Sequence, residues 1–400
     1  MKTSIGIWGL CLCAVSLSKA ADIKVEKAGA EKTSLDLSAV AVRGKEPAAF
    51  RTTLVNDLIR SGWFTVVQEG GAIVLRGTCI EDGAGLRARI SARNKATTKV
   101  FLDRGFSSTP DARRLAHEVA DALVKAIIGV PGIASTRIAM IRSNEGRKDV
   151  YVCDSDGGNV TPITRDGAVC LSPSWGKGRD TLVYTSYHQG FPDVYRLDLR
   201  RRKRMRLSGF PGLNAGADVS PDGRRVALTL SKDGNPDLYI LDLRSRRLTP
   251  LARTRFAAEA SPSWSPDGSR IVFVSDKSGS PQLHVVSRNG RGERQLTWRG
   301  AATENVAPDW GVSGRIAYSS KRGGRYQVCL LDPAGKRNWQ LTREYLDHEE
   351  PSWAPDGRHI VYTRTVGFRS DIYILDTLGD PPLRLTRLAG NWYSPDWSRE

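Results

Sequence analysis

The stretch ASPSWSPDGSRIVFVSDKSGSPQLHVVSRNGRGERQLT, residues 260–297, reads as four short strands separated by turns. The first strand ends at Trp264 and is followed by the turn Ser265-Pro266-Asp267-Gly268. In such a turn proline presets φ, aspartate tolerates the next position, and glycine supplies the conformation that leads back into a strand. Further strands are expected at residues 270–275, 282–286 and 294–297. The stretch therefore predicts one four-stranded antiparallel sheet.

This unit recurs every 43 to 46 residues from about Arg137 to the end of the chain. One marker of the repeat ends the first strand, at Trp175, Val219, Trp264, Trp310, Trp353 and Trp397. A second marker begins the third strand, at Asp149, Asp193, Asp237, Gln282, Gln327 and Asp371. Six copies of a sheet that cannot bury both faces alone predict a six-bladed β-propeller.

The strand count also predicts how the ring closes. The first unit begins at Arg137–Ile141 without a Trp-type strand before it, whereas residues 391–397 form such a strand with nothing after it. The two ends should therefore complete one blade together, with the C-terminal strand closing the ring.

The N-terminal residues 1–20 resemble a secretory signal. Lys2 precedes the apolar run Ile5–Leu17, and Ser18-Lys19-Ala20 fits a cleavage site after Ala20. The run is too short to span a membrane. Leucine precedes both Cys11 and Cys13, where lipoprotein processing needs a small residue. We therefore expect a soluble exported protein without a lipid anchor.

Residues 21–130 differ from the repeat in the spacing of their apolar residues, and this spacing predicts a small α/β domain. A helix is expected over Phe50–Arg60, and a second one from Thr109-Pro110-Asp111 to the stop at Gly129. Strands are expected between them at residues 64–68, 72–80, 86–93 and 99–107. Residues 131–136 then form a linker to a propeller at residues 137–400. The whole chain is thus expected to combine an α/β domain with an all-β domain.

The formal net charge of +17 falls to +15 when the signal and its two lysines are removed. In an exported chain such a charge favours an envelope polyanion or an acidic protein, rather than nucleic acid, as the binding partner. The densest basic run, residues 200–206, is interpreted as a solvated turn between strands, with a docking patch as the alternative.

Specific stretches resemble the TolB family. They are DLIRSGWF at Asp57–Phe64, AHEVAD at Ala116–Asp121, and Thr136-Arg137-Ile138-Ala139 at the domain junction. The resemblance implies a periplasmic adaptor of the Tol-Pal system of Gram-negative bacteria. Such an adaptor bridges the lipoprotein Pal, which docks on the propeller, and TolA, which engages the extreme N-terminus. The system supports outer-membrane integrity and constriction during cell division.

The loops that enter the first strand of each blade should gather around the mouth of the central channel. They are residues 165–171, 209–217, 253–259, 300–307, 344–350 and 388–393. Two of these loops resemble the family's Pal-facing loops. The residues expected to contact Pal are Leu213, Asn214, Glu304, Asn305, Asp347, His348 and Glu349. The alternative is that they are ordinary solvated turns.

The mature N-terminus is the second candidate site. Asp22, Ile23, Lys24, Val25 and Glu26 alternate polar and apolar residues, the pattern of a half-buried strand. This segment could serve TolA by adding to a sheet edge, or it could be the first strand of the α/β domain. The two roles are compatible if the segment switches between them.

Catalytic motifs do not appear in the sequence. There is no Gly-x-Ser-x-Gly elbow, His-Glu-x-x-His pair or Walker loop. His117 and Asp121 share a helix face and are interpreted as a structural polar pair or as plain surface positions. We expect a monomeric protein that is not an enzyme and needs no cofactor or metal. It should bind Pal, TolA and other envelope proteins, reach membranes only through partners, and bind no nucleic acid. The alternatives are an exported propeller that binds an envelope polyanion and one related to peptidase-associated domains.

Overall fold

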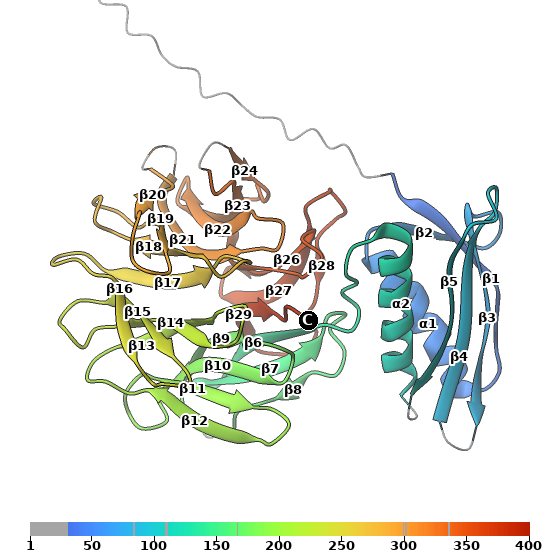
Figure 1. Ribbon diagram of the computed structural model, residues 1–400, viewed down its shortest axis with the longest axis horizontal. Coiled ribbons are helices and arrows are strands. Elements are labelled where there is room, and N and C mark those ends of the chain that lie inside the picture. Colours follow the sequence, from blue (N-terminus) through green and yellow to red (C-terminus); the bar gives the residue numbers. More distant parts are fainter. Residues whose placement is uncertain are drawn as a thin grey trace, which may run out of the picture.

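The computed structural model describes residues 31–82, 85–108, 111–165, 167–298, 300, 302–334 and 337–400. The expected signal at residues 1–20 and the expected TolA segment Asp22–Glu26 lie outside these ranges. An α/β part and a propeller lie side by side (Figure 1). The fold class is as the sequence predicts, whereas the domain limits at residues 130 and 137 stay a prediction. Over the described ranges, no helix has the length and apolar character needed to cross a membrane.

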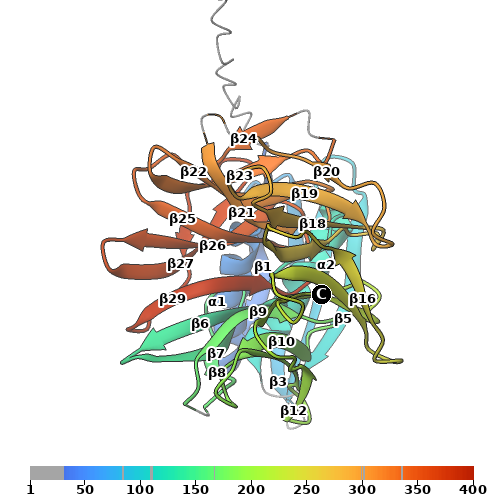
Figure 2. The same cartoon turned by 90° about the vertical axis from the view of Figure 1, so that its left-hand side faces the viewer.

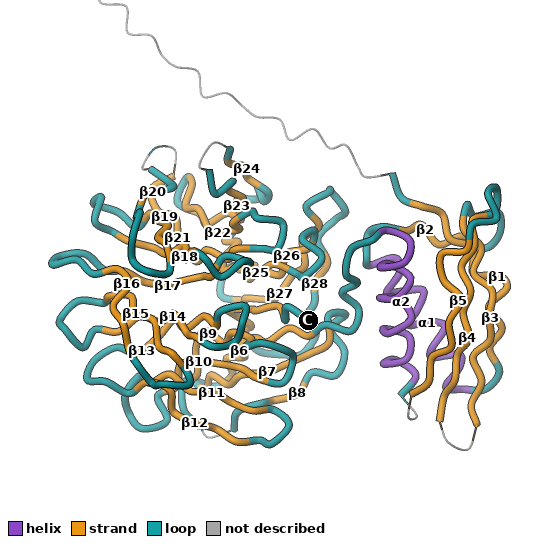
Figure 3. The backbone as a smooth tube through the Cα atoms, viewed as in Figure 1, coloured by secondary structure: helices purple, strands orange, loops and turns teal. Residues whose placement is uncertain are grey.

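The α/β part contains one five-stranded sheet with the strand order β2-β1-β3-β4-β5. Strand β1 runs parallel to both of its neighbours, and the remaining pairs are antiparallel. Two helices cover the face of the sheet that is turned toward the propeller (Figures 1 and 3). Its elements are β1 (Thr33–Val42), α1 (Lys45–Arg60), β2 (Phe64–Val67), β3 (Ile73–Asp82), β4 (Gly85–Asn94), β5 (Val100–Ser108) and α2 (Ala112–Ile128).

The signals expected to delimit helix α2 are confirmed. Asp111 accepts the backbone N–H of Arg114 at the N-terminus, and Gly129 adopts a left-handed conformation at the C-terminus. Strand β1 was not predicted. A register shift between Asp36 and Ala39 interrupts its pairing with β3, so its buried residues do not alternate regularly.

The propeller contains six four-stranded sheets among the described residues. The first strands contact one another around the ring, and they are β9 (Cys170–Trp175), β13 (Asn214–Val219), β17 (Glu259–Trp264), β21 (Ala302–Trp310), β25 (Asp347–Trp353) and β29 (Asn391–Trp397). The second strands are β6 (Arg137–Asn144), β10 (Thr181–Ser186), β14 (Arg225–Leu230), β18 (Arg270–Ser275), β22 (Ile316–Arg322) and β26 (His359–Val366).

The third strands are β7 (Arg147–Asp154), β11 (Asp193–Asp198), β15 (Asp237–Asp242), β19 (Gln282–Ser287), β23 (Arg325–Leu331) and β27 (Arg369–Asp376). The outermost strands are β8 (Thr161–Pro162), β12 (Lys203–Ser208), β16 (Leu248–Ala252), β20 (Arg294–Gln295), β24 (Asn338–Gln340) and β28 (Leu383–Arg384). Four of the outermost strands have only two or three residues, which suits sheet edges that face solvent, whereas β12 and β16 are longer.

The ring closes as the strand count predicts. The C-terminal strand β29 pairs antiparallel with β6, so one sheet has the order β29-β6-β7-β8. Trp392 and Trp397 of β29 are both 1% exposed and belong to the same apolar cluster as Ile138 and Met140 of β6.

Side chains just before the Trp-type positions join neighbouring blades. They alternate between serine and aspartate around the ring, as Ser174, Asp218, Ser263, Asp309, Ser352 and Asp396. Asp218 accepts the backbone N–H of Trp264 in the next blade at 2.7 Å, and Ser352 accepts that of Trp397 at 3.1 Å. Asp396 accepts the backbone N–H of Trp175 at 2.6 Å. This bond links β29, the first strand nearest the C-terminus, to β9, the first strand that comes earliest in the sequence.

A bulge lies at the same place in every first strand. One residue per strand has a positive φ and the pairing shifts there, at Ser172, Gly216, Ser261, Ala307, Glu350 and Ser394. A β-bulge changes the direction of the side chains that follow it. The regular bulge therefore sets the alternating serines and aspartates in the same position in each blade.

Deleting residues 391–400 should abolish the cooperative unfolding of the propeller. The deletion removes the closing strand and two buried tryptophans, and each buried tryptophan contributes about 3–5 kcal/mol to a total stability of only about 5–15 kcal/mol. Thermal unfolding followed by circular dichroism is the measurement. The matched control is Leu383→Ala in the exposed strand β28, which should change the Tm little. A truncated chain with the Tm of the full chain would contradict closure by β29.

Candidate functional site at the propeller mouth

The loops expected to carry the binding site gather on one face of the ring, here called the mouth face. Arg325 at the start of β23 pairs with Asp347 at the start of β25 at 2.8 Å. Ser370 donates its backbone N–H to Asn391 at the start of β29. The starts of the first and third strands therefore lie at the same end. The α/β part lies at the other end, and Figure 2 views the propeller from the mouth side.

Asn214 is fully buried and holds its own loop together. Its side-chain oxygen accepts from Ser208 Oγ at 2.7 Å and from the backbone N–H of Phe210 at 3.0 Å. Its side-chain nitrogen donates to the carbonyl oxygens of Phe210 and Gly212. Each polar atom of the Asn214 side chain is thus engaged within the protein, and the neighbouring Leu213 is half-buried.

Asn305 and His348 are also buried, each 2% exposed. Asn305 donates to Gln282 Oε1 at 2.8 Å, which ties the loop to the adjacent blade. The ring of His348 stacks on Tyr362 with 5.5 Å between centroids. Burial lowers the pKa of His348 to about 4, so the imidazole is neutral at physiological pH.

The three expected acidic residues lie closer to the surface. Glu304 pairs with Lys321 at 2.8 Å, and Asp347 pairs with Arg325. Glu349 is half-buried, and burial together with the neighbouring Glu350 and Asp347 raises its pKa to about 7. Burial likewise raises the pKa of Glu259 to about 7. The mouth face therefore holds buried carboxylates that are only partly ionised at neutral pH.

Exposed aromatic and aliphatic side chains gather on the mouth face, and the sequence interpretation missed them. Phe256 is 88% exposed, Tyr345 76% and Trp298 61%. The full set comes from the loops between fourth and first strands and the turns between second and third strands: Tyr187, Phe191, Phe210, Phe256, Trp298, Tyr345, Val366, Phe368 and Leu388. The available signal was the presence of large apolar residues in segments otherwise rich in turn residues.

Cationic groups lie over several of these rings. The Arg255 guanidinium is 5.1 Å from the ring of Phe256, and that of Arg325 is 5.2 Å from the ring of Tyr345. Such contacts contribute about 0.5–1 kcal/mol at exposed sites and hold the rings outward. Aromatic and arginine side chains are enriched in protein–protein interfaces. The mouth face thus has the composition of a protein-binding surface.

Fold and site together define a two-part protein in which a six-bladed propeller, closed by its C-terminal strand, carries an aromatic mouth face. A family model described as TolB beta propeller domain matches residues 124–400. The crystal structure of TolB from Acinetobacter baumannii matches with a TM-score of 0.81 and 25% identity, over 94% of this chain and 98% of that one.

Two relatives extend the comparison. The Tol-Pal system protein TolB of Ruthia magnifica is 33% identical over 305 residues, which cover 75% of this chain and 71% of the relative. The Tol-Pal system protein TolB of Alcanivorax borkumensis is 36% identical over 126 residues, which cover 30% of this chain and 29% of the relative. That second alignment thus spans less than a third of either protein. The chain belongs to the TolB family.

Asn214→Ala should destabilise the protein by about 1–3 kcal/mol, because buried backbone groups of the loop lose their hydrogen-bond partner. Urea unfolding measures this loss. The matched control is Asn289→Ala in an exposed turn, which should stay within about 0.5 kcal/mol of the parent protein. Equal stabilities of the two variants would show that Asn214 does not hold the loop.

His348→Phe should flatten the pH dependence of stability on the acidic side. The unfolded histidine titrates near 6.5, so the unfolded state binds more protons than the folded state between that pH and about 4. The native protein should therefore lose stability as the pH falls through this window. Urea unfolding at several pH values tests this difference. An unchanged slope in the variant would mean that His348 titrates normally.

Proposed function

We propose that this chain is a periplasmic, protein-binding adaptor of the Tol-Pal system. In this proposal the mouth face docks Pal and the segment Asp22–Glu26 engages TolA, in support of outer-membrane integrity and cell division. The names of the relatives support membership of the Tol-Pal system. The sequence of residues 1–20 supports export.

The observation that carries the proposal is the set of exposed aromatic side chains on the mouth face. Large exposed apolar groups cost solvation free energy in a free protein, and they mark interaction sites when they gather on one surface. The loops that bear them are fixed by buried side chains such as Asn214 and Asn305. A surface held in shape before binding loses little conformational entropy when a partner docks.

We propose binding without catalysis as the role of the mouth face. Its buried carboxylates and the neutral His348 are engaged in packing and in contacts within the protein. An exported propeller that binds a polyanion is the alternative. It would respond steeply to salt and would be indifferent to the aromatic loop residues.

Calorimetric titration of the mature protein with the periplasmic domain of the host's Pal tests the proposal. The native chain should show saturable binding at physiological salt. The double variant Phe256→Ala/Tyr345→Ala should bind at least about tenfold more weakly, because hot spots of an interface are enriched in aromatic residues such as tyrosine and each costs about 2 kcal/mol or more when truncated. Both side chains are exposed, so their removal should leave the fold intact.

The control is the double variant Ile80→Ala/Val100→Ala, which removes two exposed apolar side chains from the α/β part. It should bind Pal as the native chain does. A separate variant, Asp347→Ala/Glu349→Ala, tests the acidic residues expected from the sequence. Absence of saturable binding, or an equal loss in the control, would contradict docking at the mouth face.

A further inference from the structure

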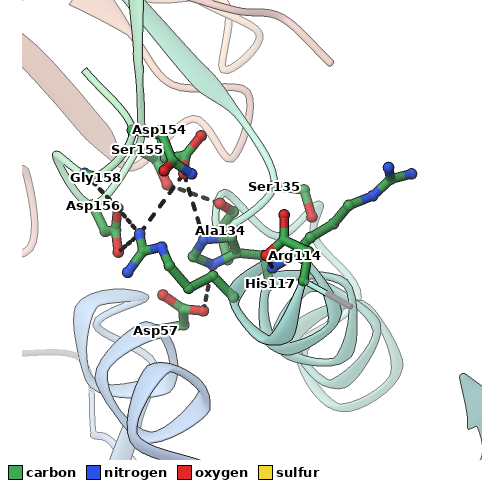
Figure 4. Close-up of polar contacts among 12 residues, drawn as sticks. Asp57, Arg114, His117, Ala134, Ser135, Asp154, Ser155, Asp156 and Gly158 are labelled. Carbon is green, nitrogen blue, oxygen red and sulfur yellow. Dashed lines mark hydrogen bonds and ion pairs between the residues drawn. The ribbon is translucent and has the colours of Figure 1, made fainter. Parts of the chain in front are cut away.

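Ionisable side chains from both parts of the chain meet at the domain junction, away from the mouth face (Figure 4). Asp57 comes from α1, and Arg113 and His117 come from α2. Asp154 ends β7, and Asp156 lies in the turn that follows it. The expected pairing of His117 with Asp121 is wrong: His117 contacts Asp57, whereas Asp121 accepts the backbone N–H groups of Ala134 and Ser135.

His117 has one ring nitrogen that is engaged and one that is not. The side chain is 5% exposed, and its Nδ1 lies 2.7 Å from Asp57 Oδ2. Within the described ranges, its buried Nε2 has no hydrogen-bond partner. Nε2 lies 4.0 Å from Asp154 Oδ2, so it is directed at the acidic residues of the propeller. A buried polar atom without a hydrogen-bond partner needs an explanation, and a bound ion is one. Among the described residues the ring nitrogens of His284 and His348 also have no partner, but only Nε2 of His117 is directed at a group of carboxylates.

The arrangement matches the surroundings of a metal-binding histidine. Such a histidine donates one ring N–H to a carboxylate, which fixes the tautomer and leaves the lone pair of the other nitrogen free for a cation. Asp57 is placed to accept that N–H. One ligand atom each from His117, Asp154 and Asp156 lies within 4.8 Å of the others. We propose that these three residues bind a divalent transition-metal ion, with Asp57 as the residue that orients His117.

Carboxylates outnumber guanidinium groups at the junction. Asp57, Asp154 and Asp156 supply three carboxylates; Arg113 contacts the latter two, and Arg60 donates to the carbonyl oxygen of Asp156 at 2.7 Å. Burial lowers the pKa of His117, but the hydrogen bond to Asp57 and the charges of the three carboxylates together outweigh this effect and raise the pKa above the ordinary value, so a bound ion has to displace a proton from Nε2.

Arg113 Nη2 donates to both carboxylate oxygens of Asp156, and the backbone N–H of Gly158 donates to Asp156 Oδ1. Asn159 Nδ2 donates to Asp154 Oδ2 at 2.6 Å. Because each carboxylate oxygen has two lone pairs, Oδ2 of Asp154 and Oδ2 of Asp156 each keep one for a cation.

The donor set indicates which cation. One imidazole nitrogen with carboxylate oxygens suits Zn²⁺, whereas Ca²⁺ and Mg²⁺ prefer ligand sets made of oxygen alone. The adjacent Cys153 packs in the apolar cluster of Ile138 and Trp397 and is not part of the group formed by the three ligand atoms, so sulfur ligation is not expected. A bound ion would join helix α2 to strand β7 and thereby tie the α/β part to the propeller.

Calorimetric titration of the metal-stripped full mature chain with Zn²⁺ tests the proposal. One saturable site is expected. His117→Gln and Asp154→Asn should each weaken binding by at least about tenfold, and Asp57→Asn by about 10–100-fold, the usual effect of losing a residue that orients a ligand. The matched control is His188→Gln, which removes an exposed histidine and should leave the affinity unchanged. Pal binding is measured separately, so each proposal can fail alone.

Absence of a saturable site, or equal affinity in His117→Gln, would overturn the proposal. If the variants do not fold, as judged by circular dichroism, X-ray absorption at the zinc edge of the native chain replaces them. A shell of nitrogen and oxygen atoms with the scattering of one imidazole is expected. A shell with sulfur, or one without imidazole, would also overturn it.

Discussion

The hydrogen bonds between neighbouring first strands are the constraint on which the ring depends. Five of the six side chains before the Trp-type positions accept the backbone N–H of a Trp in the next blade, and Ser174 donates to the side chain of Asp218 instead. The bond between Asp396 and Trp175 returns to the beginning of the ring. Burial, with the nearby Asp309 carboxylate, raises the pKa of Asp396 to about 8. Arg399 donates to Asp218 at 2.9 Å and so places a positive charge beside these carboxylates. Polar side chains at the centre of the propeller are thus paired with one another, and these contacts continue through the closing strand β29.

The hydrogen-bonded ring of first strands explains how the mouth face can expose large apolar side chains on loops. The loops begin and end on strands that the ring fixes. Asn305 and Asn391 tie their loops to the adjacent blades, and Asn214 holds its own loop together. The loops that carry the exposed aromatic side chains therefore have little freedom to change conformation and bury them. At the opposite end, charged residues join the α/β part to the propeller through Arg113, Asp156 and their neighbours. The proposed binding surface and the contacts between the two parts therefore lie at opposite ends of the same strands.

The sequence predicts the blades well because their signals are local. Turn residues and strand alternation recur in phase, and counting strands is enough to predict closure by β29. The sequence pattern does not predict β1, because the bulge after Asp36 breaks the alternation of buried and exposed residues. The sequence also suggests Asn214, Asn305 and His348 as Pal contacts, because they lie in the expected mouth loops, two of which resemble the family's Pal-facing loops. These side chains are buried, and their contact with Pal stays a prediction. The junction cluster combines residues far apart in the chain, which no local pattern reveals.

The most direct test of the central claim, that the mouth face is the docking surface, is amide hydrogen exchange in the presence and absence of the periplasmic domain of Pal. The account predicts slower exchange in the mouth loops, above all at residues 209–213, 253–258 and 343–348. Exchange on the open face of the five-stranded sheet should not change. Protection confined to that sheet, or to the turns beside the domain junction, would contradict docking at the mouth face.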